Sequence, residues 1–202
     1  LSAPVLGVLP KDPSPLRLGR GAQTEVEERL RAARTNVLHA LSHGARQVVV
    51  VTSAGPREGA STTAAGLARV LALSGHRVVL VGGDLRSPSA GGAPGAPELA
   101  EVLVGTARLS QVLVEGEVPG LELLPAGDMP GNPSELLGGR NMSDLLHHLA
   151  ADRIVIIDAP PVCRFTDAVV LAEYAGGVLL VARAGRTSAE ELREAALAVG
   201  QG

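Results

Sequence analysis

Short runs of consecutive apolar residues alternate with helical segments along this chain, and this alternation constrains the fold more than any other feature. The runs lie at residues 48–51, 78–81, 154–157 and 177–182, and a further predicted strand at 121–124 is apolar except for one glutamate. Runs that are apolar at every position are typical of parallel strands that are buried on both faces. We therefore predict an α/β fold in which a parallel sheet is covered by helices on both faces.

Helix signals fill the segments between these runs. They predict helices over residues 24–42, 61–73, 97–104, 109–114, 134–149, 166–174 and 188–199. Thr24 with Glu27 has the spacing of a capping box at the start of the first helix. Ser188 with Glu191 has the same spacing at the start of the last one. Gly75 is predicted to cap the second helix at its C-terminal end.

The length and composition fit one domain with a well-buried core. We predict a single domain over residues 1–202, with 1–23 as an extended lead-in and linker and 24–202 as the core. Residues 87–97, which are rich in Gly, Pro, Ala and Ser, are predicted to form a loop. The net charge of -3 and the aromatic content of 1% argue against a nucleic-acid partner.

A glycine-flanked turn follows the first apolar run and precedes a helix. The candidate nucleotide-binding residues in this turn are Gly55, Arg57, Glu58, Gly59, Ala60, Ser61 and Thr62. A P-loop of this kind aims backbone N–H groups at phosphates and ends in Gly-Lys-Ser/Thr. Ala60 stands where the lysine belongs, and Ser61 stands where a hydroxyl ligand for Mg²⁺ belongs. By itself this degraded motif is equally compatible with a plain glycine turn.

Two aspartates follow other predicted strands. Asp84 comes after the second run and Asp158 after the fourth. Because the carboxyl ends of parallel strands meet at one edge of a sheet, both should lie near the P-loop. We predict Asp84 and Asp158 as residual catalytic residues and, with Ser61, as Mg²⁺ ligands. The alternative for Asp158 is a structural helix or turn cap.

These segments resemble a known family. The turn over residues 54–62, then 79–86 (VLVGGDLR) and 155–161 (VIIDAPP), are similar in this order to the Walker A, A′ and B motifs of bacterial tyrosine autokinases (BY-kinases). Residues 121–137 and 158–187 are similar to other parts of the same domain. The resemblance implies a P-loop NTPase-like fold. It also implies the cytoplasmic domain of a polysaccharide co-polymerase or capsular exopolysaccharide kinase.

Two departures from the family pattern bear on activity. The Walker A lysine is Ala60, and the first Walker A′ aspartate is Gly82. Losing one such electrostatic group costs about 3 to 4 kcal/mol of transition-state stabilisation. We therefore expect a degenerate kinase, with ATP or ADP and Mg²⁺ bound weakly or not at all. Arg57 is a candidate substitute for the lysine, and the alternative is an exposed loop arginine.

Glu28, Arg31 and Arg34 are spaced by three on the first helix and share one flank. The plain interpretation is a solvated charged stripe. The resemblance instead implies the family's oligomerisation motif, and hence a homo-oligomeric ring. It also implies a transmembrane chain-length regulator in the same or a partner chain, and a location at the cytoplasmic face of the plasma membrane. The chain's one tyrosine, Tyr174, is predicted to be a packed side chain.

Three functions remain open from the sequence. The first is a degenerate kinase-like domain that regulates or scaffolds exopolysaccharide or capsule chain-length control. The second is an active but slow tyrosine autokinase that uses ATP and Mg²⁺. The third is a P-loop ATPase of the positioning or partitioning type, which usually carries an extra lysine early in the loop, where this chain has Gly55 and Pro56.

Overall fold

A computed structural model describes residues 4–10, 25–42, 46–86, 97–127 and 131–200. Its centre is a six-stranded sheet of order β3-β4-β2-β5-β1-β6. The strands are β1 (Val48–Ser53), β2 (Val78–Gly82), β3 (Val114–Glu115), β4 (Leu121–Leu124), β5 (Ile154–Asp158) and β6 (Gly177–Val181). β1, β2 and β5 lie in the middle of the sheet and are almost wholly buried, as their unbroken apolar runs predict.

The predicted parallel sheet is confirmed for the five longer strands, and a short strand that was not predicted, β3, is added at one edge. β3 pairs with β4 in the antiparallel sense, with Val114 opposite Leu123. Both residues of β3 are exposed, so this strand lacks the apolar run by which the others were found. The helix predicted over 109–114 is shorter than expected, because residue 114 belongs to β3.

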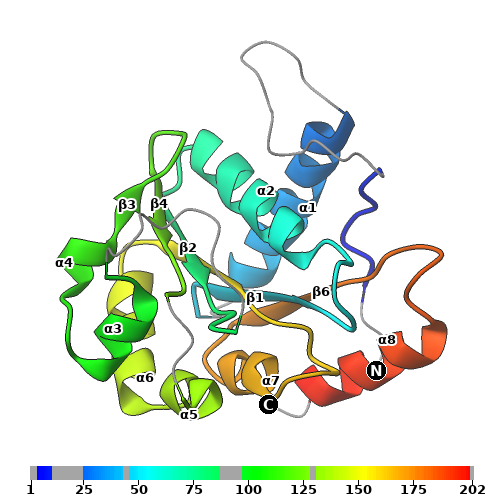
Figure 1. Ribbon diagram of the computed structural model, residues 1–202. Helices are drawn as coiled ribbons and strands as arrows, with labels where there is room; N and C mark the ends of the chain where they lie inside the picture. The colour runs from blue at the N-terminus through cyan, green and yellow to red at the C-terminus, as the bar shows by residue number, and fades with distance from the viewer. Residues whose placement is uncertain (1–3, 11–24, 43–45, 87–96, 128–130, 201–202) are drawn as a thin grey trace.

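Helices cover both faces of the sheet (Figure 1). They are α1 (Glu25–Ser42), α2 (Ala60–Leu73), α3 (Leu99–Val104), α4 (Leu109–Val112), α5 (Pro133–Leu137), α6 (Arg140–Ala150), α7 (Asp167–Ala172) and α8 (Ala189–Val199). α1 and α2 pack on one face, and α3 to α8 pack on the other. Each face therefore has its own hydrophobic core. No described helix is long and apolar enough to cross a membrane.

The helix predicted over 134–149 is two helices. α5 ends at Leu137 and α6 begins at Arg140. A Cβ added to Gly138 would lie 3.1 Å from Val170 Cγ1 on α7, so the glycine lets the two helices approach closely. Because Gly138 and Gly139 also have the lowest helix propensity apart from proline, the chain changes direction there.

Other predicted boundaries are confirmed or shifted slightly. The Ser188 capping box forms, since Glu191 N donates to Ser188 Oγ at 3.1 Å. The cap of α2 is Ser74 rather than Gly75, which follows it with a φ of 92°. The helix predicted over 166–174 is confined to α7. Thr24 and most of the predicted loop over 87–97 lie outside the described residues. Residues 4–10 form no helix or strand.

Candidate active site

The turn between β1 and α2 has the shape of a phosphate loop. Gly59 caps α2 with a φ of 107°, in the left-handed region that favours glycine. Thr63 closes the first helical turn, because its N–H and its hydroxyl both donate to Gly59 O, at 2.9 and 2.8 Å. Ser53 Oγ donates to Gly55 O at 2.8 Å and braces the other end of the turn. The P-loop backbone predicted from the glycines is therefore formed.

The end of β5 is fastened beside this loop. Ala159 N donates to Val51 O at 2.9 Å, and Val162 N donates to Ser53 O at 2.9 Å. Thr52 is fully buried and its hydroxyl donates to Pro160 O at 2.7 Å. These bonds hold the chain after Asp158 against the P-loop.

The predicted metal ligands meet at this edge of the sheet. Asp158 is paired in register with Val51 on β1 and with Gly82 on β2. Its carboxylate accepts a hydrogen bond from the Ser61 side chain and lies close enough to Asp84 to feel its charge. Asp84 itself accepts a hydrogen bond from Arg86 N at 3.0 Å.

The donor set of Ser61, Asp84 and Asp158 suits Mg²⁺, which prefers oxygen ligands. In the described part of the chain, no group of three His, Cys, Asp or Glu side chains could hold a metal ion. The two carboxylates and the hydroxyl would therefore share Mg²⁺ with the oxygens of a bound phosphate.

Burial raises the pKa of Asp158 to about 6. The hydrogen bond from Ser61 favours the ionised carboxylate and opposes this rise, whereas the nearby negative charge of Asp84 adds to it. A bound cation would lower the pKa of Asp158 by favouring the charged form.

The two positions that depart from the family pattern have different surroundings. Ala60 begins α2, lines the cavity beside the P-loop and is 9% exposed. Gly82 ends β2, and a Cβ added there would lie 2.8 Å from Ala126 N and 3.1 Å from Ala126 Cβ. Backbone atoms therefore occupy the space into which an aspartate at position 82 would project.

A cavity of about 420 Å³ lies over the P-loop. Its lining includes every predicted nucleotide-binding residue except Gly55, together with Asp84. Residues that were not predicted also line it: Ser53, Pro56, Ala159, Pro160, Pro161, Arg164 and Phe165. The sequence signal for the last five was their position directly after Asp158, at the carboxyl end of a central strand.

Arg86 is a further residue of this site that the sequence analysis did not single out. Its Nε donates to Asp167 Oδ2 at 2.7 Å, and one terminal nitrogen donates to Asp167 Oδ1 at 3.2 Å and to Ser134 Oγ at 3.1 Å. Its guanidinium carbon lies 4.6 Å from the centre of the Phe165 ring. Asp167 is fully buried. This bidentate pair ties the chain after Asp84 to the start of α7.

Arg57 and the charged flank of α1 make separate contacts within the chain. Arg57 has a φ of 61°, unusual for a residue with a side chain, and its carbonyl accepts a hydrogen bond from Arg183 at 3.1 Å. On α1, Arg31 pairs with Glu27 at 2.7 Å and with Glu28 at 3.4 Å.

Arg34, the last residue of that flank, donates to Val70 O on α2 at 3.5 Å. The flank therefore makes contacts within this chain, and its role in oligomerisation stays a prediction. Tyr174 packs against one of the two cores, as predicted.

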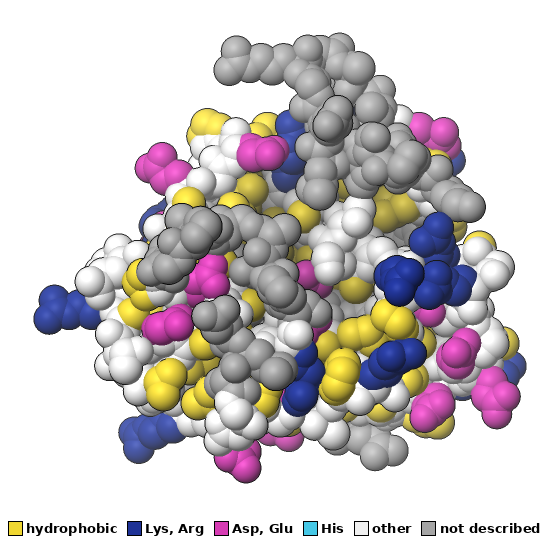
Figure 2. Space-filling model, viewed as in Figure 1, with side chains coloured by type: hydrophobic (Ala, Val, Ile, Leu, Met, Phe, Trp, Pro, Cys, Tyr) yellow, Lys and Arg dark blue, Asp and Glu magenta, His cyan; other side chains and the backbone are white. Residues whose placement is uncertain are grey.

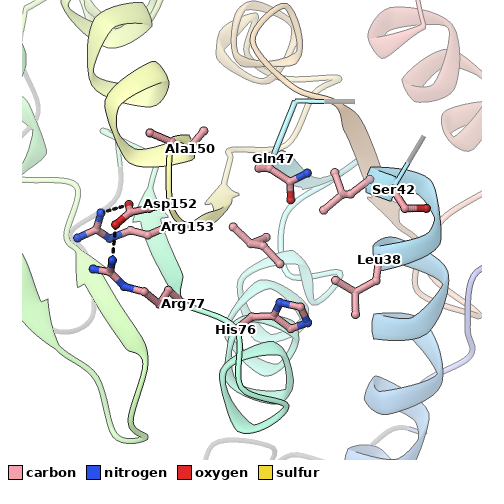
Figure 3. A pocket seen from close by; sticks show the side chains of 11 residues that line it. Leu38, Ser42, Gln47, His76, Arg77, Ala150, Asp152 and Arg153 are labelled. Atoms are coloured by element: carbon pink, nitrogen blue, oxygen red, sulfur yellow. Dashed lines mark hydrogen bonds and ion pairs between the residues drawn. The ribbon is translucent and has the colours of Figure 1, made fainter. Parts of the chain in front are cut away.

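A second cavity, of about 370 Å³, lies at the opposite end of the sheet, near the start of β2 and β5. Figure 3 shows Asp152 hydrogen-bonded to both Arg77 and Arg153 at one side of it. Arg153 also donates to Glu122 at 2.5 Å. The charged side chains at this cavity pair with one another, and none of the predicted site residues lines the cavity.

The comparisons with known proteins agree with the geometry. No family model matches the chain. The chain is 39% identical over 171 residues to the putative tyrosine-protein kinase EpsB of Ralstonia nicotianae, covering 83% of this chain and 23% of that protein. It is 37% identical over 172 residues to tyrosine-protein kinase YwqD of Bacillus subtilis, covering 83% of this chain and 73% of YwqD. The chain thus spans about a quarter of EpsB and about three quarters of YwqD.

Solved structures point the same way. The chimerical protein CapA2B2 is 30% identical, with a TM-score of 0.90 over 98% of this chain and 88% of that one. The kinase domain of the Escherichia coli tyrosine kinase ETK is 27% identical, with a TM-score of 0.86 over 98% and 85%. McdA of Cyanothece, at 22% identity and a TM-score of 0.64 over 76% and 63%, shares the fold alone. With YwqD matched over most of its length, these findings show that the chain belongs to the bacterial tyrosine kinase (BY-kinase) family.

Proposed function

We propose that this domain is a degenerate BY-kinase domain that regulates or scaffolds exopolysaccharide or capsule chain-length control, with weak or no phosphoryl transfer. The observation that carries the proposal is the pair of departures at one site. The first residue of α2 presents the methyl group of Ala60 to the cavity, and Ala126 closes the space beside Gly82. The residues that would stabilise the transferring phosphoryl group and complete the metal site are therefore both absent.

The remaining residues support binding of a nucleotide better than its turnover. The P-loop backbone and the start of α2 provide N–H groups for phosphates. Ser61, Asp84 and Asp158 would hold Mg²⁺, which would neutralise part of the phosphate charge. Without the lysine, about 3 to 4 kcal/mol of transition-state stabilisation is missing, which corresponds to a rate about 10² to 10³ lower.

Assembly and location complete the proposal. EpsB is matched over 23% of its length, which is consistent with a kinase domain that works within or beside a larger protein. We infer a homo-oligomer in which the flank formed by Glu28, Arg31 and Arg34 contacts a neighbouring copy. We also infer a transmembrane chain-length regulator in the same or a partner chain, and a cytoplasmic location at the plasma membrane.

Phosphoryl transfer from ATP–Mg²⁺ to a tyrosine-containing copolymer tests the proposal, with YwqD as the active reference. We expect at least 100-fold less transfer than by YwqD, and little recovery in Ala60→Lys, because Gly82 is still present. Transfer within tenfold of YwqD would overturn the proposal and establish the slow autokinase instead. Hydrolysis of ATP without transfer would favour an ATPase of the positioning type.

A further inference from the structure

The cavity over the P-loop has an unusual balance of charge. Glu58 is 7% exposed, lines the cavity and has one carboxylate oxygen, Oε2, without a hydrogen-bond partner. Asp84 also lines the cavity, and Asp158 lies beside it through its bond with Ser61. Three carboxylates thus surround a space that would receive anionic phosphates. Binding there needs positive charge beyond a single Mg²⁺ ion.

Among the described residues that charge can come only from arginine, because the single lysine of the chain, Lys11, lies outside them. Most arginines of the described chain are already engaged. Arg29, Arg31, Arg77, Arg86, Arg140 and Arg153 form ion pairs, and Arg34, Arg46 and Arg183 donate to backbone carbonyls. The arginines that line the cavity are Arg57 and Arg164. Within the described residues, neither side chain makes an ion pair or a hydrogen bond.

Arg164 is held on the cavity rim by its neighbours in the chain. Its N–H and that of Phe165 both donate to Pro161 O, at 3.0 and 3.1 Å. Phe165 lies against the Arg86 guanidinium, and both carboxylate oxygens of Asp167 accept hydrogen bonds from Arg86. The backbone at Arg164 is therefore fixed while its side chain is exposed. Figure 2 shows arginine side chains gathered beside apolar ones on one part of the visible face.

Arg57 and Arg164 approach the cavity from different walls. Arg57 belongs to the P-loop, whose contribution to phosphate binding is its backbone N–H groups. Arg164 follows β5, on the wall that carries Pro160 and Pro161. A guanidinium from this second wall can contact the phosphate oxygens that the loop leaves exposed. Its planar fork suits two oxygens of one phosphate.

We propose that Arg164 is a phosphate-binding residue that supplies, from the chain after β5 rather than from the P-loop, the positive charge that Ala60 does not. The ligand class is a nucleoside di- or triphosphate with Mg²⁺, and Arg57 makes a smaller contribution. This inference rests on the proposed function only in taking the cavity as a nucleotide site. Arg164 binds and neutralises the phosphates, and no bond in the ligand is broken.

Calorimetric titration of the protein with ADP–Mg²⁺ and with pyrophosphate–Mg²⁺ tests the assignment. Arg164→Ala should weaken the binding of both by about 10- to 100-fold, the effect of removing a charge-assisted hydrogen bond. Arg164→Lys should recover part of the loss. Arg186→Ala is the matched control, because Arg186 is exposed and does not line the cavity. Thermal melting of each variant checks that it is folded.

The outcomes separate this inference from the proposed function. A dissociation constant for Arg164→Ala within twofold of the unsubstituted protein overturns the assignment, as does an equal loss in Arg186→Ala. If the unsubstituted protein binds neither ADP nor pyrophosphate at millimolar concentration, the assignment is also wrong. The proposed lack of phosphoryl transfer then still stands, because only the transfer assay with YwqD as reference can overturn it.

Discussion

The two positions at which this chain departs from its family lie on neighbouring parts of one site, yet their surroundings differ. Ala60 stands at the wall of an open cavity. Gly82 stands where the backbone of Ala126 leaves no space for a side chain. A longer side chain at the first position has a cavity beside it into which it can extend, whereas one at the second would meet backbone atoms.

This contrast separates two kinds of lost function. The absence of a side chain beside a cavity removes a catalytic group and leaves the packing of the fold unchanged. At Gly82, by contrast, the close approach of Ala126 has become part of the packing between β2 and the chain after β4. Restoring the family residue there would have to break that packing. Five substitutions would break or sharpen the contrast, and they follow in order of expected effect.

The Arg86–Asp167 pair should account for the largest effect, because it fixes the chain that follows Gly82. Arg86→Met leaves the fully buried Asp167 carboxylate without its cation. Removing one partner of such a pair costs about 3 to 5 kcal/mol. Urea unfolding should show this loss, and Asp167→Asn in the same background should recover part of it. A loss under about 1 kcal/mol would mean that the pair does not fix this region.

Asp158 joins the two regions and should make stability depend on pH. Its folded pKa of about 6 lies above the ordinary value of about 3.9. Between these values the folded protein binds more protons than the unfolded chain, so stability falls as the pH rises from about 4 to about 6. The expected change is about 2 kcal/mol. Asp158→Asn should remove it from urea unfolding curves measured across this range, and an unchanged curve would contradict the assignment.

Gly82→Ala should cost about 1 to 2 kcal/mol, because the new Cβ would meet Ala126 N at 2.8 Å. The matched control is Gly177→Ala in β6, where an added Cβ has no atom within 4 Å. Equal stability of the two variants in urea would show that the space beside Gly82 is not closed.

Ala60→Lys should be tolerated with a loss below about 1 kcal/mol, because the lysine stem can extend along the wall while its amine reaches the open cavity. Urea unfolding compared with that of Gly82→Ala gives the contrast directly. A larger loss for Ala60→Lys than for Gly82→Ala would reverse it.

Arg57→Gly should give the smallest change, a gain of about 0.5 kcal/mol. The φ of 61° strains a residue with a side chain by about 1 kcal/mol. The greater freedom of glycine in the unfolded chain offsets part of the relief. Arg57→Ala keeps the strained φ and serves as the control in thermal unfolding. Equal melting temperatures for the two variants would indicate that the loop is not strained at this position.

Much of the fold and half of the site could be read from the sequence because the signals are local. The apolar runs of β1, β2 and β5 are buried on both faces, so no polar residue interrupts them. The glycines of the P-loop and the aspartates at the strand ends are likewise read from neighbours in the chain. β3 was missed because it is short and exposed, and the break between α5 and α6 because it depends on contact with α7.

By itself the sequence determined the family, the parallel core and the absence of a lysine at position 60, since each depends on residue identity and spacing. The tertiary structure decided which residues distant in the sequence come into contact. It placed Ala126 against Gly82, brought Arg164 to the same cavity as Ser61, and joined Arg86 to Asp167. These contacts link residues from about 40 to 100 positions apart, and a distant contact is set by how layers pack rather than by any local pattern.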